Sequence, residues 1–473
     1  MSKLPFLRHL TVVALSVGCT VAILAQPIDL GQRRELFVDR YLIEEMRGIE
    51  LRLHPPTKAP RAQSPLPEKH MTTVIKDGNR YRAWYRSNDP TYTGPFHSGH
   101  PGETVHYAES SDGHEWTFPT LQLREFDGKK GNNAILTQLP PYLTNFMPFL
   151  DTRPGVDPAE RYKAVAGYPG GGNKLGLKKD GIGLFGFVSP DGITWTKKNE
   201  IIPYRPEWRH AFDSPNVAFW SEAEQRYVCY FRTWKEPSRL RSIGRSTSPD
   251  FVNWSTPVEM NPNLPGEHLY TSGTHPYVRA PHLYLAMPTR FVPLAKDSAE
   301  TINDNVTDVL FMTTRSGSDH YDRTFREHFI RSGTDPKRCT NRANYVAQNI
   351  VQTGPEELSI YHRSGDRYVL RLDGFASVRA GTEQGELLTK PLTFSGARML
   401  INFSASAVGS VQVDLIDPVS HLILASSQRI TGDAIDLPVK WRNLEDLSKI
   451  AGKPLRIRFT LMDADLYSFC FAP

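Results

Sequence analysis

Two acidic side chains stand where the chain passes from a loop into a strand-like segment, and they are the best candidates for catalysis. Asp213 interrupts an apolar stretch directly before Ser-Pro, and Glu267 follows Pro265-Gly266. Two converging carboxyl groups, one ionised and one protonated, can cleave a glycosidic bond. We therefore expect Asp213 to act as base or nucleophile and Glu267 as general acid. A turn-capping aspartate and a solvated loop glutamate are the competing interpretations.

Other polar side chains precede the same kind of aromatic strand and are expected to bind a substrate. They are His70, Glu103, Asn145, His268, Tyr270, His275, Arg290, Arg342 and Asn344. An arginine among asparagines can bind a carboxylate or sugar hydroxyls, which makes Arg342 a candidate. Arg232 and Arg290 lie at strand ends, where either could hold a neighbouring carboxylate ionised. Loop aromatics could stack on sugar rings: Tyr92, Phe96, Tyr142 and Trp208.

A repeated turn motif indicates how these residues are positioned. Its form is Ser-x-Asp-Gly-x-x-Trp, and copies occur at 110–116, 189–195 and 248–254, with a degenerate copy at 315–321. Aspartate caps its own backbone and glycine accepts positive φ, so each copy predicts a tight turn. An aromatic-rich strand precedes each copy. A fifth unit fits Glu357 to Tyr361 with a return strand around Asp373-Gly374-Phe375.

Five such units predict an all-β fold: a five-bladed β-propeller over residues 26–380. The expected blades span about 68–120, 143–198, 210–257, 266–325 and 341–380. The segment 28–60 is expected to supply a strand that helps to close the ring. Residues 381–473 lack the repeat but alternate in polarity, which predicts a C-terminal β-sandwich.

The N-terminus predicts export. Lys3 and Arg8 precede a run from Leu10 to Leu24 that is apolar or small apart from Thr and Ser, and the run ends at Ala25. We expect a signal peptide over 1–25, a secreted or periplasmic protein, and no membrane attachment after cleavage. A retained anchor and a lipoprotein lipidated at Cys19 are the alternatives.

Charge and cysteine content narrow the partners. The net charge of +5 over 473 residues comes without a basic run, which argues against nucleic-acid binding. Cys229, Cys339 and Cys470 lack CxxC spacing, and a Cys339–Cys470 disulfide remains open. No cofactor or metal is expected; calcium on the propeller axis is conceivable, but no ligand motif supports it. The sequence leaves the oligomeric state open.

Several segments resemble the five-bladed-propeller glycoside hydrolases of families 32 and 43. The closest resemblance is to secreted bacterial family-32-like proteins of poorly defined activity, and it covers nearly the whole mature chain. It rests on 36–44, 211–220, 267–270, 289–291, 350–355 and 463–469.

The resemblance implies three acids at the propeller axis: an aspartate in the first blade, an aspartate in Arg-Asp-Pro, and a glutamate. Asp213 in Phe-Asp-Ser-Pro is similar to the second, and Glu267 stands for the third. The aspartate of the first blade has no counterpart, because the segment from Pro65 to His70 contains no aspartate and offers only Glu68 and His70 as candidates. Asp39 is an alternative for this position.

We therefore expect a secreted glycoside hydrolase acting on a poly- or oligosaccharide. A non-catalytic glycan-binding propeller is the second hypothesis. The third is a polysaccharide lyase with Tyr270 or His275 as base beside Arg342.

Overall fold

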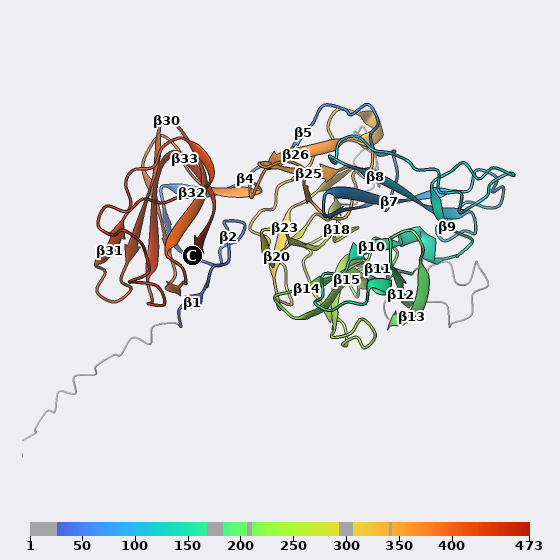
Figure 1. Cartoon of the computed structure of the whole chain (residues 1–473), viewed down its shortest axis with the longest axis horizontal. Helices are drawn as coiled ribbons and strands as arrows, with labels where there is room; N and C mark the ends of the chain where they lie inside the picture. The colour runs from blue at the N-terminus through green and yellow to red at the C-terminus, as the bar shows by residue number, and fades with distance from the viewer. Residues whose placement is uncertain (1–25, 168–182, 206–210, 293–305, 340–342) are drawn as a thin grey trace, which may run out of the picture.

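The computed structural model describes residues 26–167, 183–205, 211–292, 306–339 and 343–473. The described chain is all-β, with a few short 3-10 turns such as η1 (Tyr142–Asn145), η2 (Pro158–Glu160) and η4 (Pro336–Arg338). Figure 1 shows two bodies, with a layered one around β30–β33 on the left and a group of small sheets on the right. Within the described residues, no helix has the length and apolarity needed to cross a membrane.

Three four-stranded antiparallel sheets follow one another in chain order. Sheet 1 contains β6 (Thr73–Asp77), β7 (Arg80–Asn88), β8 (Glu103–Ser110) and β9 (Ala134–Thr137). Sheet 2 contains β10 (Met147–Leu150), β11 (Tyr162–Ala166), β12 (Gly183–Ser189) and β13 (Thr196–Pro203). Sheet 3 contains β14 (Val217–Ser221), β15 (Arg226–Lys235), β16 (Leu240–Ser248) and β17 (Val258–Glu259).

The fourth unit is split into two three-stranded pieces, which together we call sheet 4. One piece is β18 (His268–Leu269), β21 (Thr289–Phe291) and β22 (Thr307–Val309). The other is β19 (His275–Tyr277), β20 (Ala280–Ala286) and β23 (Met312–Arg315). Pro288 lies between β20 and β21, and because proline has no backbone N–H it interrupts the strand there.

Sheet 5 is completed by a strand from the other end of the chain. Its strands are β24 (Val351–Gln352), β25 (Glu357–Tyr361), β26 (Arg367–Arg371) and β5 (Thr57–Lys58). The pairing of β5 with β26 is the closure expected from the segment 28–60. The first strands of neighbouring sheets are in contact: β6 with β10, β10 with β14, β14 with β19, and β24 with β6.

The repeated turns join each sheet to the one before it. In three copies the aspartate carboxylate accepts two backbone N–H bonds, as Asp191 does from Ile193 at 2.8 Å and Thr194 at 2.7 Å. The turn of sheet 2 receives a 2.7 Å bond from Trp84 of sheet 1 to the Gly192 carbonyl. The same relation recurs around the sheets, in the pairs Tyr361–Gly113, Phe149–Phe251, Tyr230–Tyr321 and Tyr277–Phe375.

The C-terminal body is built on two long strands, β30 (Arg398–Ile416) and β33 (Arg456–Ala472). Register shifts in their pairing, as between Ala405 and Ser410, allow such long strands to bend. Shorter strands pair along them: β27 (Ala376–Ala380), β28 (Gly385–Thr389), β31 (Ile423–Ser426) and β32 (Asp433–Pro438). One apolar cluster, which includes Phe459 and Phe469, forms the core of this body.

The N-terminal strands differ from the expected boundaries. Residues 26–380 were expected in the ring, but four N-terminal strands pair in the C-terminal body: β1 (Ile28–Asp29) with β29 (Leu392–Thr393), β2 (Glu35–Leu36) with β33, β3 (Ile43–Arg47) with β28, and β4 (Ile49–Leu53) with β27. These pairings join residues more than 300 positions apart, and no local pattern encodes them.

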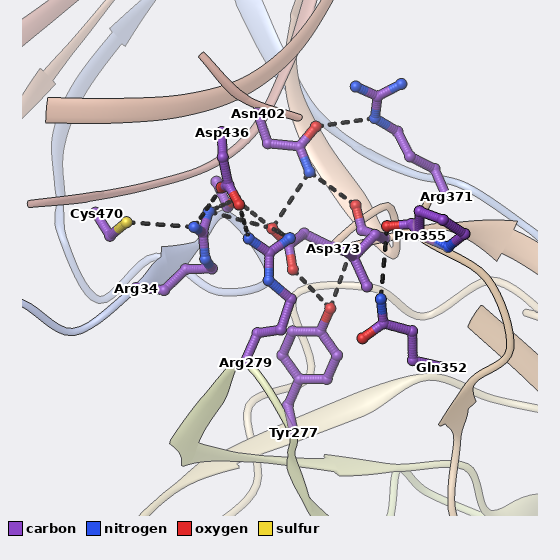
Figure 2. A network of polar contacts seen from close by, with 12 residues as sticks. Arg34, Tyr277, Arg279, Gln352, Pro355, Arg371, Asp373, Asn402, Asp436 and Cys470 are labelled. Atoms are coloured by element: carbon purple, nitrogen blue, oxygen red, sulfur yellow. Dashed lines mark hydrogen bonds and ion pairs between the residues drawn. The ribbon is translucent and has the colours of Figure 1, made fainter. Parts of the chain in front are cut away.

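A buried acid joins the two bodies (Figure 2). Asp373 is wholly buried and accepts hydrogen bonds from Tyr277 at 2.6 Å and Arg279 at 3.1 Å, both of sheet 4. From the C-terminal side it accepts from Ser468 at 2.6 Å, and Arg34 also reaches it at 3.3 Å. The second acid at this junction, Asp436, pairs with both arginines.

The possible disulfide is not formed. Cys229, Cys339 and Cys470 are free thiols. The Cys470 sulfur accepts a hydrogen bond from Arg34 at 3.3 Å within the junction of Figure 2, whereas the Cys339 thiol donates to the carbonyl oxygen of Gly333 at 3.4 Å.

Candidate active site

Segments that precede the first strands of the five sheets meet at one place, which we call the mouth. Residues from all five sheets line a small cavity there: Met71, Thr72, Met147, Pro215, Thr271, Gly273, Met287, Tyr345, Val346 and Gln348. Beyond it, the first strands enclose a mostly apolar cavity of about 530 Å3. Two candidates adjoin this lining in sequence: Asp213 lies two residues before Pro215, and Tyr270 directly precedes Thr271.

Asp213 is held at the mouth by its buried neighbours. Phe212 before it and Ser214 after it are buried, and Asn145 donates its amide N–H to the carbonyl oxygens of both. Phe212 adopts a φ of 62°, a conformation that turns the chain sharply. The Asp213 carboxylate is 36% exposed and forms a 2.9 Å ion pair with the buried Arg232. The arrangement fixes the backbone and presents the carboxylate to solvent.

Glu267 occupies a different environment from the one expected of a general acid. Arg323 contacts both of its oxygens, at 2.8 and 3.1 Å, and the backbone N–H of Leu264 donates to it at 3.1 Å. A second arginine, Arg290, lies 4.0 Å away. Glu267 is therefore held by charge-assisted hydrogen bonds within the protein, and its side chain is only 4% exposed.

Glu103, expected to bind substrate, has the features of a proton donor. Its side chain is buried at the start of β8, and burial raises the pKa of the carboxyl. One oxygen accepts bonds from the Thr144 hydroxyl at 2.6 Å and the Gly99 N–H at 3.1 Å, and it lies 3.6 Å from Arg86 Nη1. The other oxygen is buried without a partner. Thr144 precedes Asn145, which holds the Asp213 loop.

A cluster of rings adjoins Glu103. His100 stacks on Tyr92 with ring centroids 4.8 Å apart, and Phe96 packs edge-on to it at 5.0 Å. Phe96 is 66% exposed. Exposed aromatic rings beside a carboxyl are typical of sites that stack on sugars. Two of the four loop aromatics predicted to contact sugar therefore lie beside Glu103. Trp208 falls outside the part of the chain that the structure describes.

On the other side of Asp213 lies a cluster that the sequence did not reveal. Arg241, the second residue of β16, stacks between two rings: its guanidinium carbon is 4.4 Å from the Tyr270 centroid and 4.8 Å from that of Trp234. His268 accepts a bond from the Arg241 backbone N–H at 3.1 Å. Burial and the neighbouring arginines lower the pKa of His268 to about 4, so its ring is neutral at physiological pH.

One further predicted residue, His70, lies close to this cluster. The His70 ring lies 5.6 Å from that of Tyr345, which in turn lies 6.1 Å from Tyr270. Tyr345 therefore contacts both a ring that precedes sheet 1 and a ring of sheet 4.

Other predicted binding residues have structural contacts instead. Asn344 is fully buried and donates to the carbonyls of Thr307 and Arg338. Asn145 donates to the carbonyl oxygens on either side of Asp213, as described above. Arg290 pairs with Asp308 through two nitrogens. His275 uses both ring nitrogens, with the Gly273 carbonyl at 2.9 Å and the Ile350 N–H at 3.1 Å. Arg342 lies outside the described residues.

Two expectations about acids and metals can be compared with the structure. Asp39 pairs with Arg315 at 2.8 Å near the C-terminal body, so it does not replace the missing acid of the first blade. Within the described ranges, no group of three or more His, Cys, Asp or Glu side chains could hold a metal ion.

Arg241, Trp234 and Arg323 were missed by the sequence analysis. Each is a common residue type inside a strand or loop with no motif around it, and only the folded chain brings them to the mouth. The alternation of Arg239-Leu240-Arg241 was the one available signal, and it is equally typical of a solvated strand edge.

No protein-family model matches the chain. No curated protein matches it by sequence. Solved structures are similar in fold. A β-1,2-mannobiose phosphorylase from Listeria innocua covers 68% of this chain and 91% of its own, at 11% identity and a TM-score of 0.43.

The match to a thermostable family-43 glycoside hydrolase covers 68% of this chain and 96% of that enzyme, at 12% identity and a TM-score of 0.40. A GH32 β-fructofuranosidase from Bombyx mori covers 89% and 95%, at 10% identity and a TM-score of 0.36. These are the families that the sequence motifs resemble. Likeness at this level carries no argument about catalysis, which has to rest on the site.

Proposed function

We propose that this protein is a secreted glycoside hydrolase whose active site is the mouth of a five-bladed β-propeller with a C-terminal β-sandwich. The observation that carries the proposal is Asp213: a partly exposed carboxylate, ion-paired to a buried arginine, two residues before Pro215 of the mouth. The five turn contacts between successive sheets support the propeller, and the bent strands β30 and β33 support the sandwich.

In this proposal Asp213 is the base or nucleophile and Glu103 is the proton donor. Glu103 combines burial, a raised pKa and a carboxyl oxygen without a partner, which are the properties that general acids require. Glu267, the expected acid, is assigned to fixing Arg323 beside the mouth. Tyr92 and Phe96 would then stack on the sugar next to the leaving group.

A product analysis tests the proposed function. Purified protein is incubated with a panel of plant and algal polysaccharides, and reducing ends and ultraviolet absorbance are followed together. Hydrolysis releases reducing ends without a new absorbance. Binding of a glycan without any release of reducing ends would instead identify a glycan-binding protein and contradict hydrolysis.

A polysaccharide lyase is the second candidate, and one observation favours it. Tyr270 stacks on Arg241 next to a histidine that stays neutral, and a lyase needs such a base beside a cation that neutralises a uronate carboxylate. His275, the other expected base, is fully engaged within the protein. A lyase would release an unsaturated product that absorbs ultraviolet light.

Secretion belongs to the same proposal. It rests on Lys3, Arg8 and the run from Leu10 to Leu24, within residues that the structure does not describe. N-terminal sequencing of protein exported by a bacterial host tests it, with Gln26 as the expected first residue. Retention of the full chain in the cytoplasm would contradict it.

A further inference from the structure

We propose that Arg241 forms a subsite for an anionic group of the glycan, either a carboxylate or a sulfate. The inference deepens the proposed function, since it names the class of sugar that the mouth accepts. It rests on that function only in taking the ligand to be a glycan.

The contacts of Arg241 leave one N–H donor of its guanidinium, at Nε, without a hydrogen-bond partner. Trp234 and Tyr270 cover its faces, and one terminal nitrogen lies 3.3 Å from His268 Nδ1. Its Nε is buried and has no hydrogen-bond partner. Among the described residues, no carboxylate lies within ion-pair distance of Arg241. Stacking therefore fixes the plane of the guanidinium, while a donor at its edge has no partner.

The charges around Arg241 favour an anion. Burial and the like charge of Arg232 lower the pKa of Arg241, while Tyr270 and Asp213 oppose that shift. Among the described residues, the ion pair of Asp213 is with Arg232, at 2.9 Å, and not with Arg241. His268 is neutral, since its pKa is lowered to about 4, so it does not balance the charge of Arg241.

An uncompensated buried cation costs stability unless a ligand completes it. Guanidinium donors suit the two oxygens of a carboxylate or the oxygens of a sulfate ester, and they bind a neutral hydroxyl far less strongly. The geometry points to a sugar that carries an anionic group near Asp213.

Binding measurements test this without requiring turnover. Titration calorimetry would compare a uronate-containing oligosaccharide, its carboxyl-reduced neutral counterpart, a sulfated oligosaccharide and inorganic sulfate. We expect an acidic oligosaccharide to bind about tenfold more tightly than the neutral one, because charge-assisted hydrogen bonds are the stronger kind. The uronate and sulfate arms identify which anion is preferred. Equal affinity for acidic and neutral oligosaccharides would overturn the inference.

Variants locate the effect at Arg241. Arg241→Gln should remove the preference for the acidic sugar, and Arg241→Lys should restore part of it. Arg47→Gln is the matched control, since Arg47 is 72% exposed on the C-terminal body. If Arg241→Gln fails to fold, the test is the salt dependence of binding to the wild-type protein. Affinity for the acidic oligosaccharide should fall with ionic strength, and affinity for the neutral one should not. A salt-independent affinity would contradict the subsite.

The two proposals fail in different ways. Tight binding of an acidic oligosaccharide with no release of reducing ends supports the subsite and contradicts the hydrolase. Hydrolysis of a neutral glycan, with no preference for its acidic counterpart, supports the hydrolase and contradicts the subsite.

Discussion

Three acidic residues considered for catalysis differ in what surrounds them, and our proposal assigns their roles from those surroundings. Asp213 is partly exposed with one arginine, Glu267 is buried with a bidentate arginine, and Glu103 is buried with an oxygen that has no partner. Residue type alone could not separate them. Glu267 lies directly before β18 and Asp213 lies in the loop before β14, but the bidentate contact of Glu267 comes from Arg323, 56 positions away.

Glu103→Gln should lower activity by about 100-fold or more, since it removes the proposed proton donor. Because burial raises the pKa of Glu103, the folded protein binds its proton more tightly than the unfolded chain does. This contribution to stability is therefore present at low pH and lost as pH rises through the raised pKa. The Glu103→Gln variant should not show this fall in stability with rising pH, and melting temperatures measured as a function of pH test it.

A wild-type rate that does not fall at alkaline pH would contradict Glu103 as the acid. Glu109→Gln is a control on the same strand, because Glu109 lies at the far end of β8.

Glu267→Gln should mainly affect stability. Breaking a buried ion pair leaves Arg323 unpaired, at a cost of about 4 kcal/mol. Denaturant unfolding measures this cost, and Arg323→Gln should give a loss of similar size. If Glu267→Gln were as stable as the wild type but inactive, the original assignment of Glu267 as the acid would be restored.

At the scale of elements, the repeat predicted more than any other feature. All five aromatic segments form strands, and the aspartates of the turns bind the backbone as predicted. Their local bonds lie within four residues, which is why the sequence reveals them. The N-terminal strands could not be placed, since their partners lie at the opposite end of the chain. The split of sheet 4 has a visible cause, Pro288, that was not recognised.

Gly192→Ala should destabilise the protein by roughly 2 kcal/mol, because its φ is positive and a Cβ would lie 2.8 Å from the Trp84 ring. Gly78→Ala is the matched control, since Gly78 also has a positive φ but open space around it. Denaturant unfolding of both variants gives the difference due to the turn contact. Equal losses would show that the turn does not lock sheet 2 to sheet 1.

At the scale of the whole molecule, polar clusters join the ring of sheets to the C-terminal body. Beside the network of Figure 2, Glu35 of β2 accepts bonds from His282 at 3.0 Å and Arg315 at 2.9 Å of sheet 4. The N-terminal strands β1 to β4 pair in the C-terminal body, and the next strand, β5, pairs in sheet 5. The chain therefore connects the two bodies near its N-terminus as well as near residue 375. We expect them to unfold together.

The junction should weaken in acid. Burial opposes ionisation of Glu35, but His282 and Arg315 lower its pKa to about 2. A depressed pKa contributes stability above the unfolded value, and that contribution is lost as pH falls towards 2. Glu35→Gln should therefore be less stable at neutral pH and show a shallower loss in acid. Scanning calorimetry from pH 6 to 2 checks this, and identical slopes for both proteins would contradict it.

The proposed hydrolysis at the mouth requires Asp213. The decisive measurement is kcat of Asp213→Asn on a polysaccharide that the wild type cleaves, with circular dichroism to verify the fold. We predict a loss of about 1,000-fold or more with a similar KM, because the substitution keeps the shape but removes the base or nucleophile. A folded Asp213→Asn variant that retained its rate within tenfold would contradict catalysis at this site.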